Sequence, residues 1–337
     1  MFKSYKMMFL TTLIIGTLIA ISSYSWMSMW IGLEINLLSI IPLLSDPKNL
    51  YPSESALKYF VTQTLASAII LFSIITTLNL SESTSQDFNF PSVLIMNSAL
   101  LTKMGAAPFH AWFPEVMEGL SWMNCLIMLT WQKVAPMIIL FYNSKTTLFL
   151  SSIVIISSVV SGIMGLNQIS MRKILAYSSI NHIGWMIASM LSPQAIWVVY
   201  FLIYSLITFN IVIILDKLNI FYLKQLYNSI NQNKKVKFFF ILNFLSLGGL
   251  PPFLGFFPKW LTINFLVQNN FIGLSLILIV FTLVTLYFYL RITFSSMLIY
   301  SQEMLITQTK PKMFLIYASN FVTLVGLLAC TLIFNLY

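Results

Sequence analysis

The segment that decides the fold reads Lys103-Met104-Gly105-Ala106-Ala107-Pro108-Phe109-His110-Ala111-Trp112-Phe113-Pro114-Glu115. It continues an apolar run that begins near Pro91, so at a rise of about 1.5 Å per residue Lys103 stands about 18 Å into a predicted helix. Gly105 and Pro108 then interrupt that helix, because proline lacks the backbone N–H that a continuing helix needs. The sequence therefore places a charged side chain beside a broken helix.

The same pattern of glycine, proline and aromatic residues returns 144 positions later. The first copy, Gly105-x-x-Pro108-Phe109-x-x-Trp112-x-Pro114, is matched by Gly249-x-x-Pro252-Phe253-x-x-Phe256-x-Pro258, with Pro251 just before the second proline and Lys259 directly after the match. We therefore expect two related halves of the chain, each with one interrupted helix.

The composition is that of a membrane protein. Of the 337 residues, 58% are hydrophobic and 8% are charged, whereas soluble globular domains carry about 25% charged residues. This excludes a soluble enzyme. The chain offers no Cys-x-x-Cys pair, because Cys125 and Cys330 stand alone in apolar segments, and no glycine-rich nucleotide-binding loop. We therefore expect no metal and no redox cofactor in this chain.

Apolar runs of about 20 residues are long enough to cross a bilayer as helices. They predict an all-α polytopic membrane protein with eleven spans, at residues 4–23, 26–45, 54–78, 91–119, 122–143, 146–166, 170–191, 194–216, 237–268, 271–298 and 313–335. The fourth and the ninth span are the interrupted ones. The connections are short, so a single transmembrane bundle over residues 1–337 is expected.

The two interrupted spans divide the bundle into two repeats of five helices, residues 1–143 and 146–298, with 313–335 as a final helix. Because five is an odd number, the second repeat starts from the opposite side of the membrane, and the two repeats are inverted. Interrupted helices at matching positions of inverted repeats indicate a transport pathway near the membrane midplane.

Most of the 18 Lys and Arg residues fall in loops on one side of this topology, and the other side has only Lys145. Positive loops stay on the matrix or cytoplasmic side. The asymmetry predicts an N-terminus on that side and a C-terminus on the opposite side.

Four charged residues are predicted near mid-depth in the spans: Glu34, Lys103, Lys133 and Lys259. An ionised side chain at a helix centre costs about 2.5–3.5 kcal/mol on the insertion scale, so each needs a partner, water or a role. Desolvation favours the neutral amine of lysine and a nearby carboxylate restores its charge, so such a row can load and release protons. The alternative is a static buried ion pair that stabilises the bundle.

Three further residues are candidates for proton relay, each with an alternative. Lys58 lies about one turn into its span, where its ammonium also reaches the membrane interface by snorkelling. His110 follows the first break and also suits capping of freed carbonyl groups. His182 shares a helix face with Ser178, four residues earlier, which favours a relay.

Three segments carry a resemblance to a known family. They are Lys103–Pro114, the run Arg172-Lys-Ile-Leu-Ala-Tyr-Ser-Ser-Ile-Asn-His182-Ile-Gly-Trp185, and the run Leu247-Gly-Gly-Leu-Pro-Pro-Phe-Leu-Gly-Phe-Phe-Pro-Lys259-Trp260. Together they resemble the subunit 2 family of mitochondrial NADH:ubiquinone oxidoreductase, respiratory complex I, in an insect-type form. That family is similar to the large subunits of multisubunit cation/proton antiporters, and the likeness covers essentially the whole chain.

The resemblance implies roles for the polar row. Glu34 and Lys103 would form the ion pair of the first half-channel, Lys133 would be the central connecting lysine, and Lys259 would lead to the exit side. The chain would be a proton-translocating part of H⁺-translocating NADH:ubiquinone reductase in the inner mitochondrial membrane, with its N-terminus in the matrix and its C-terminus in the intermembrane space.

The resemblance also implies partners. FMN, iron–sulfur clusters and ubiquinone are expected in other subunits of the complex and none of them in this chain. Antiporter-like neighbours, small membrane subunits and inner-membrane lipids such as cardiolipin are expected partners, and nucleic acid is not. Two alternatives stay open: a cation/proton antiporter subunit, driven by ion gradients, and a structural spacer whose charges affect assembly only.

Overall fold

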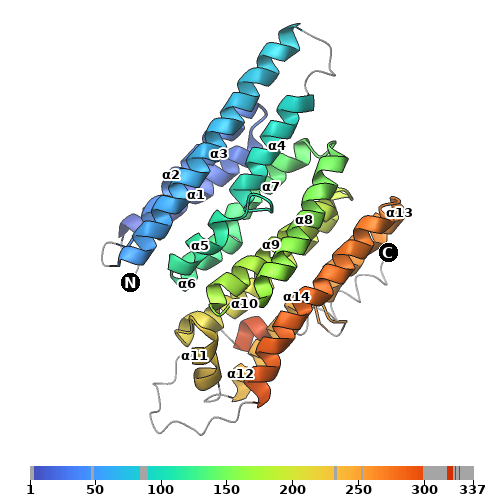
Figure 1. Ribbon diagram of the computed structural model, residues 1–337. Coiled ribbons are helices and arrows are strands. Elements are labelled where there is room, and N and C mark those ends of the chain that lie inside the picture. The colour runs from blue at the N-terminus through green and yellow to red at the C-terminus, as the bar shows by residue number, and fades with distance from the viewer. Residues whose placement is uncertain are drawn as a thin grey trace. The chain divides into compact units, whose positions relative to one another are not determined.

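The computed structural model describes residues 4–46, 49–83, 90–230, 234–251, 253–298, 317–321, 323 and 326 (Figure 1). In these ranges the chain forms fourteen named α-helices, and the β structure is limited to one isolated bridge between Ser170 and Tyr222. The predicted all-α architecture is confirmed. Two compact units divide the chain, Met1–Ile153 and Val154–Tyr337. Their boundary lies near that of the predicted repeats, whose inverted relation stays a prediction.

The first unit contains seven helices and the start of an eighth. They are α1 (Ser4–Ser22), α2 (Trp26–Leu44), α3 (Leu50–Ser83), α4 (Phe90–Met104), α5 (Trp112–Gly119), α6 (Trp122–Leu129), α7 (Trp131–Tyr142) and α8 (Thr147–Leu166), which crosses into the second unit. Helix α3 packs against α2, α4 and α5, and α7 contacts α1, α2 and α4. The charged residues of α2, α4 and α7 therefore belong to neighbouring helices.

A close approach of two backbones joins α1 to α2. A Cβ atom added at Gly32 would stand 2.5 Å from the backbone nitrogen of Ala20 and 2.8 Å from its Cα. Small residues allow membrane helices to approach this closely. In lipid, helices associate through van der Waals packing, because no hydrophobic driving force acts between them. Gly32 therefore fixes how deeply α2 seats against α1.

The second unit is built around a buried helix. It contains α9 (Met171–Met190), α10 (Gln194–Lys217), α11 (Leu223–Ile230), α12 (Lys234–Gly248), α13 (Phe256–Gln268) and α14 (Ile272–Leu298). Every residue of α9 from Ile174 to Met190 is buried, although the helix carries Asn181, His182 and several serines. Helices α10, α13 and α14 contact it, so its polar side chains lie within the protein.

The two helix interruptions share one backbone geometry. Gly105 has φ +75° and Gly249 has φ +77°, the left-handed region that favours glycine. After α4 the amides of Gly105 and Ala106 bond the carbonyls of Thr102 and Leu101; after α12 the amides of Gly249 and Leu250 bond those of Ser246 and Leu245. Both ends are Schellman motifs, in which glycine ends the helix and satisfies its last carbonyl groups.

Seven segments of the described chain are long and apolar enough to cross a membrane, namely Ser4–Ser22, Trp26–Leu44, Leu50–Asn79, Trp122–Tyr142, Thr147–Leu166, Gln194–Lys217 and Ile272–Phe294. The predicted spans 91–119 and 237–268 are each two shorter helices, α4 with α5 and α12 with α13. The predicted span 122–143 also divides, at Thr130, into α6 and α7.

Some predictions fall on parts of the chain outside this description. Pro252 and Cys330 are outside the described residues, and the predicted helix 313–335 is described only at 317–321, 323 and 326, where the backbone is helical. Cys125 is a buried free thiol.

Candidate functional site

Lys103 lies in the last turn of α4, directly before the first Schellman motif, and 7% of its surface is exposed. Its backbone carbonyl accepts a hydrogen bond from the Gln63 amide of α3, at 3.5 Å. A cation in the last turn of a helix interacts favourably with the helix dipole. A buried ammonium group therefore lies at the end of an interrupted helix.

Glu34 of α2 is half-buried, and its Oε1 atom is buried with no hydrogen-bond partner in the described part of the chain. Helices α2 and α4 both pack against α3, so Glu34 and Lys103 lie in the same unit. Among the described residues, however, the two side chains form no ion pair within 4.0 Å. The structure therefore holds the two predicted partners in the same unit with their charges apart.

Lys133 of α7 is the most buried of the lysines, with 1% of its surface exposed. Its Nζ lies 5.7 Å from the centre of the Phe113 ring of α5. An aromatic face attracts a cation, so this ring contributes to a buried site for the ammonium. Phe113 also fills the space beside Gly105, where an added Cβ would meet its Cβ at 3.1 Å, and it therefore connects Lys133 to the first break.

A chain of polar side chains links α2, α3 and α7. The Gln132 Nε2 atom donates to Asn36 Oδ1 at 2.9 Å, and Tyr59 donates from its hydroxyl to Gln132 Oε1 at 3.3 Å. Sequence analysis did not single out these three residues. The available signal was Gln132 itself, a polar residue beside Lys133 and four positions before Pro136 within one apolar span.

Lys58 of α3 is not placed with the buried lysines. It forms salt bridges with Glu54 and with Glu115 of α5, both at 3.2 Å, and the side chains of Lys58 and Glu115 are 43% and 59% exposed. Glu115 was not among the predicted site residues. The repeat pattern contains the signal, because Glu115 stands 144 positions before Lys259.

Lys259 of α13 turns back toward the second break. Its Nζ donates to the carbonyl oxygens of Leu247 at 3.1 Å and Gly248 at 3.0 Å, the last residues of α12, and lies 5.8 Å from the centre of the Trp185 ring. The side chain is 6% exposed. A buried ammonium is thus held by the negative end of an interrupted helix.

His182 is buried in the second unit between aromatic side chains of α10. Its Nδ1 lies 2.9 Å from the hydroxyl of Tyr200, and the ring centre of Tyr204 is 4.9 Å away. One residue earlier, the Asn181 amide donates to the Thr285 hydroxyl of α14 at 3.3 Å. These contacts give His182 a hydroxyl partner that a proton relay would use.

His110 lies in the loop between α4 and α5 and is half-buried. Its Nδ1 stands 3.3 Å from the carbonyl oxygen of Pro108. This is the kind of contact that capping of freed carbonyls involves.

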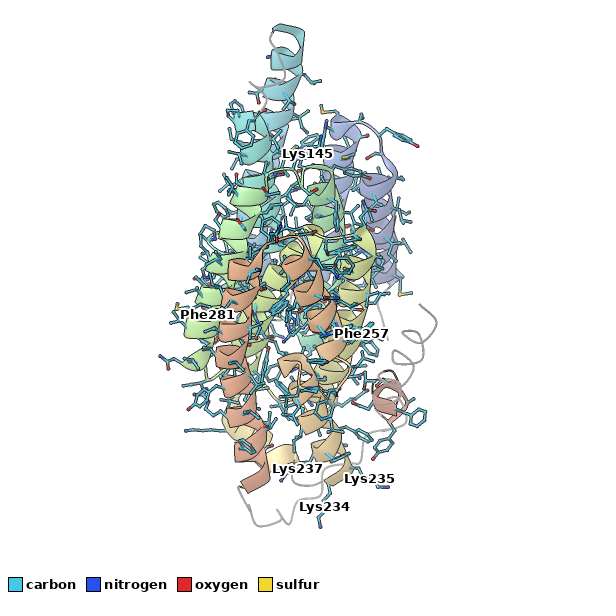
Figure 2. The ribbon with its side chains drawn as sticks, turned by 90° about the vertical axis from the view of Figure 1, so that its right-hand side faces the viewer. Lys145, Lys234, Lys235, Lys237, Phe257 and Phe281 are labelled. Atoms are coloured by element: carbon cyan, nitrogen blue, oxygen red, sulfur yellow. The ribbon has the colours of Figure 1, made fainter. Side chains whose placement is uncertain are left out.

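Figure 2 shows Lys234, Lys235 and Lys237 gathered at one end of α12, while Phe257 and Phe281 lie along other helices of the unit. In the described ranges no group of three or more His, Cys, Asp or Glu side chains is placed to hold a metal ion.

Comparison with protein families gives a match to the family described as NADH:quinone oxidoreductase/Mrp antiporter, transmembrane, over residues 23–286. Among curated proteins, NADH-ubiquinone oxidoreductase chain 2 of Anopheles gambiae is 48% identical over 331 residues, 97% of each chain. The chain of the same name from Locusta migratoria is 46% identical over 301 residues, covering 89% of this chain and 88% of that one.

Solved structures show the same fold in larger assemblies. A chain of respiratory complex I from Thermus thermophilus superimposes with a TM-score of 0.87 at 25% identity, covering 97% of this chain and 79% of that chain. A chain of the Mrp complex from Dietzia sp. superimposes with a TM-score of 0.80 at 14% identity, covering 96% of this chain and 75% of that chain. The second likeness concerns the fold alone.

Proposed function

Because this chain belongs to the NADH:quinone oxidoreductase/Mrp antiporter transmembrane family, we propose that it translocates protons as a membrane-arm subunit of respiratory complex I. Electron transfer from NADH to ubiquinone would take place in other subunits, which would hold FMN, iron–sulfur clusters and ubiquinone. This chain would contain no redox site of its own.

The observation that carries the proposal is the burial of three lysines beside interrupted or proline-containing helices. Lys103 precedes the break after α4, Lys133 lies three residues before Pro136 of α7, and Lys259 caps the break after α12. A packed core does not need three buried ammonium groups, since each is costly to desolvate. A series of sites that exchange protons does need them.

The proposed cycle is electrostatic. When the Glu34 carboxylate moves toward Lys103, the charged form of that lysine is favoured; when it moves away, desolvation favours the neutral amine and the proton is released. The proton would pass to Lys133 and then to Lys259 along water, because a change of charge at one site alters the proton affinity of the next. The separation of Glu34 and Lys103 in the described structure is consistent with a pair that forms in only part of the cycle.

The partners proposed with this function are the neighbouring membrane-arm subunits. The N-terminus would face the matrix and the C-terminus the intermembrane space, as the asymmetry of the loop lysines indicates. His110 and His182 remain proposed relay residues, and for Lys58 its exposed salt bridges favour the interfacial alternative. Of the three, His182 has the strongest support, through its contact with Tyr200.

Anionic inner-membrane lipids such as cardiolipin are further proposed partners, and a groove in the second unit supports them. The groove has a volume of about 550 Å³ and is lined by Lys234, Lys235, Phe238, Phe239, Tyr317 and Phe321. Basic residues at a helix end suit a phosphate headgroup and aromatic walls suit acyl chains. Co-purified lipid, measured by mass spectrometry, should decrease in a Lys234→Gln/Lys235→Gln variant of the assembled complex.

Replacement of Lys103 by Met tests the function. In inner-membrane vesicles with normally assembled complex, Lys103→Met should lower NADH-driven proton pumping and coupled NADH–ubiquinone turnover by at least about tenfold, since a positioned proton-transfer group contributes about 10²–10⁴-fold. Assembly is checked by native electrophoresis. A normal ratio of protons pumped to NADH oxidised in this variant would reject the role of the row.

A cation/proton exchanger is the second candidate, favoured by the match to the NADH:quinone oxidoreductase/Mrp antiporter family. It would use the same lysines with an ion gradient as the energy source. Sodium-dependent proton flux in vesicles that receive no NADH would support the exchanger, and proton flux that requires NADH and ignores sodium would reject it.

A further inference from the structure

The first unit encloses a small polar cavity next to Lys103. It has a volume of about 10 Å³, close to the space that one water molecule needs. Its wall includes one charged group, a set of hydrogen-bonding side chains and a proline, namely Lys103, Gln132, Asn36, Tyr59, Gln63 and Pro136. Only Lys103 among them was predicted as a site residue.

The orientation of the Gln132 amide in this cavity is fixed by its two neighbours. Its Nε2 donates to Asn36 Oδ1 at 2.9 Å, and its Oε1 accepts from the Tyr59 hydroxyl at 3.3 Å. An amide oxygen has two lone pairs and an amide nitrogen has two N–H groups. Gln132 therefore retains one acceptor and one donor site for a further partner.

Pro136 affects the hydrogen bonding of the Gln132 backbone. In a regular helix the amide of residue 136 would donate to the carbonyl of residue 132, but proline has no N–H. The Gln132 carbonyl group thus lacks its usual helical donor, and both residues line the cavity.

Lys103 contributes hydrogen-bond donors to the cavity. An ammonium group has three donors and no acceptor capacity, and in the described part of the chain no protein acceptor lies within hydrogen-bond distance of Lys103 Nζ. Burial of an ionised amine is costly unless its donors find acceptors. Lys103 and Gln132 line the same cavity, so an ammonium donor and an amide acceptor share one small space.

We propose that the cavity binds one water molecule that accepts a hydrogen bond from Lys103 and donates to the Gln132 amide oxygen or to its neighbouring acceptors. Gln132 is then a positioning residue, which acts on Lys103 through the water and transfers no proton itself. Tyr59 and Asn36 hold the amide in place. This inference rests on the proton-transfer role proposed for Lys103 and names a residue that this role requires.

The test is a double-mutant cycle in complex I assembled in inner-membrane vesicles. Gln132→Leu removes the polar end with little change in volume and should lower coupled NADH–ubiquinone turnover by about tenfold, the effect of a lost hydrogen-bonded partner of a charged group. The double variant with Lys103→Met should be no slower than Lys103→Met alone, because Gln132 acts only through that lysine.

The matched control is Gln194→Leu, the same substitution at an exposed glutamine at the start of α10, which should leave turnover unchanged. Two reductions that multiply in the double variant would show that Gln132 has a structural role and overturn the inference. Normal turnover of Gln132→Leu beside a deficient Lys103→Met would also overturn it while the proposed function stands. Normal turnover of Lys103→Met would reject the function itself.

If Gln132→Leu fails to assemble, Tyr59→Phe replaces it, since this variant removes only the hydroxyl that donates to Gln132. It should lower turnover in the wild-type background and have no effect in the Lys103→Met background. Equal effects in both backgrounds would contradict the proposal.

Discussion

Lys259 closes the helix that ends at Gly248, because its ammonium nitrogen lies 3.0 Å from the Gly248 carbonyl oxygen. The first break has no such cap in its matching position. There, 144 residues earlier, stands Glu115, whose carboxylate pairs with Lys58 on the outside of α3. The two interruptions therefore share a backbone geometry. They differ in the residue at the matching position, which is a lysine that caps the helix end at the second break and a glutamate that pairs with Lys58 at the first.

Loss of the Lys259 cap should weaken the protein as well as its function. Lys259→Met leaves two carbonyl acceptors without their charged donor, which should lower stability by about 1–3 kcal/mol and reduce proton pumping. Heat inactivation of the assembled complex and the proton-to-NADH ratio measure the two effects. Lys224→Met, at an exposed lysine of α11, is the control. Unchanged heat inactivation of Lys259→Met would contradict the cap.

Gly249 should tolerate no larger residue. Alanine at a left-handed position costs about 1–2 kcal/mol, and its Cβ would stand 2.7 Å from Lys259 Cδ. We expect Gly249→Ala to lower the temperature of inactivation and to reduce pumping through displacement of Lys259. Gly273→Ala is the matched control, because a Cβ atom there meets no atom within 4 Å. Equal behaviour of the two variants would refute this account.

Gly32 should govern assembly rather than pumping. Gly32→Ala forces a Cβ into the backbone of Ala20 and should cost about 1–3 kcal/mol, as overpacking does, with less complex on native gels. Gly162→Ala is the comparison, since its nearest neighbours are at an ordinary 3.5 Å. A normal amount of assembled complex with Gly32→Ala would show that α1 and α2 adjust without loss.

Lys58 should contribute little to proton transfer, because its side chain is exposed and already paired with two carboxylates. Its salt bridges with Glu54 and Glu115 are on the surface of the unit, where ion pairs stabilise weakly. Lys58→Met should leave the proton-to-NADH ratio unchanged, whereas Lys103→Met should abolish coupling. A loss of pumping with Lys58→Met would instead support the relay role predicted for Lys58 from the sequence.

Tyr200 should support His182. The hydroxyl at 2.9 Å from Nδ1 orients the ring, so Tyr200→Phe should lower coupled turnover by about two- to tenfold, the effect of one neutral hydrogen bond. Tyr287→Phe, at a tyrosine that is 61% exposed, should have no effect. Full turnover in Tyr200→Phe would show that His182 does not need the Tyr200 hydroxyl.

The local features were accessible from sequence because each depends on short-range chemistry. Gly105 and Gly249 were predicted as helix breaks from their neighbours, and left-handed glycines stand at both positions. The division of 122–143 at Thr130 and the helix α11 were not predicted. Apolar composition marks a span as a whole and does not say where the backbone within it bends.

The partners of the charges depended on the fold. Gln132 meets Asn36 and Tyr59 across 96 and 73 residues of sequence, and nothing in residue order brings them together. The pair of Glu34 and Lys103 stays a prediction, and the distance between the two charges depends on how distant helices pack.

The sequence by itself determined the membrane class, the apolar helices, the two breaks and the burial of Lys103, Lys133 and Lys259. These follow from hydropathy and from the backbone chemistry of glycine and proline, which act within a few residues. The tertiary structure alone decided what surrounds each buried lysine: helix-end carbonyls for Lys259, an aromatic face for Lys133, and a polar cavity for Lys103. Hydrogen bonds act over about 3 Å, so they depend on how distant segments pack.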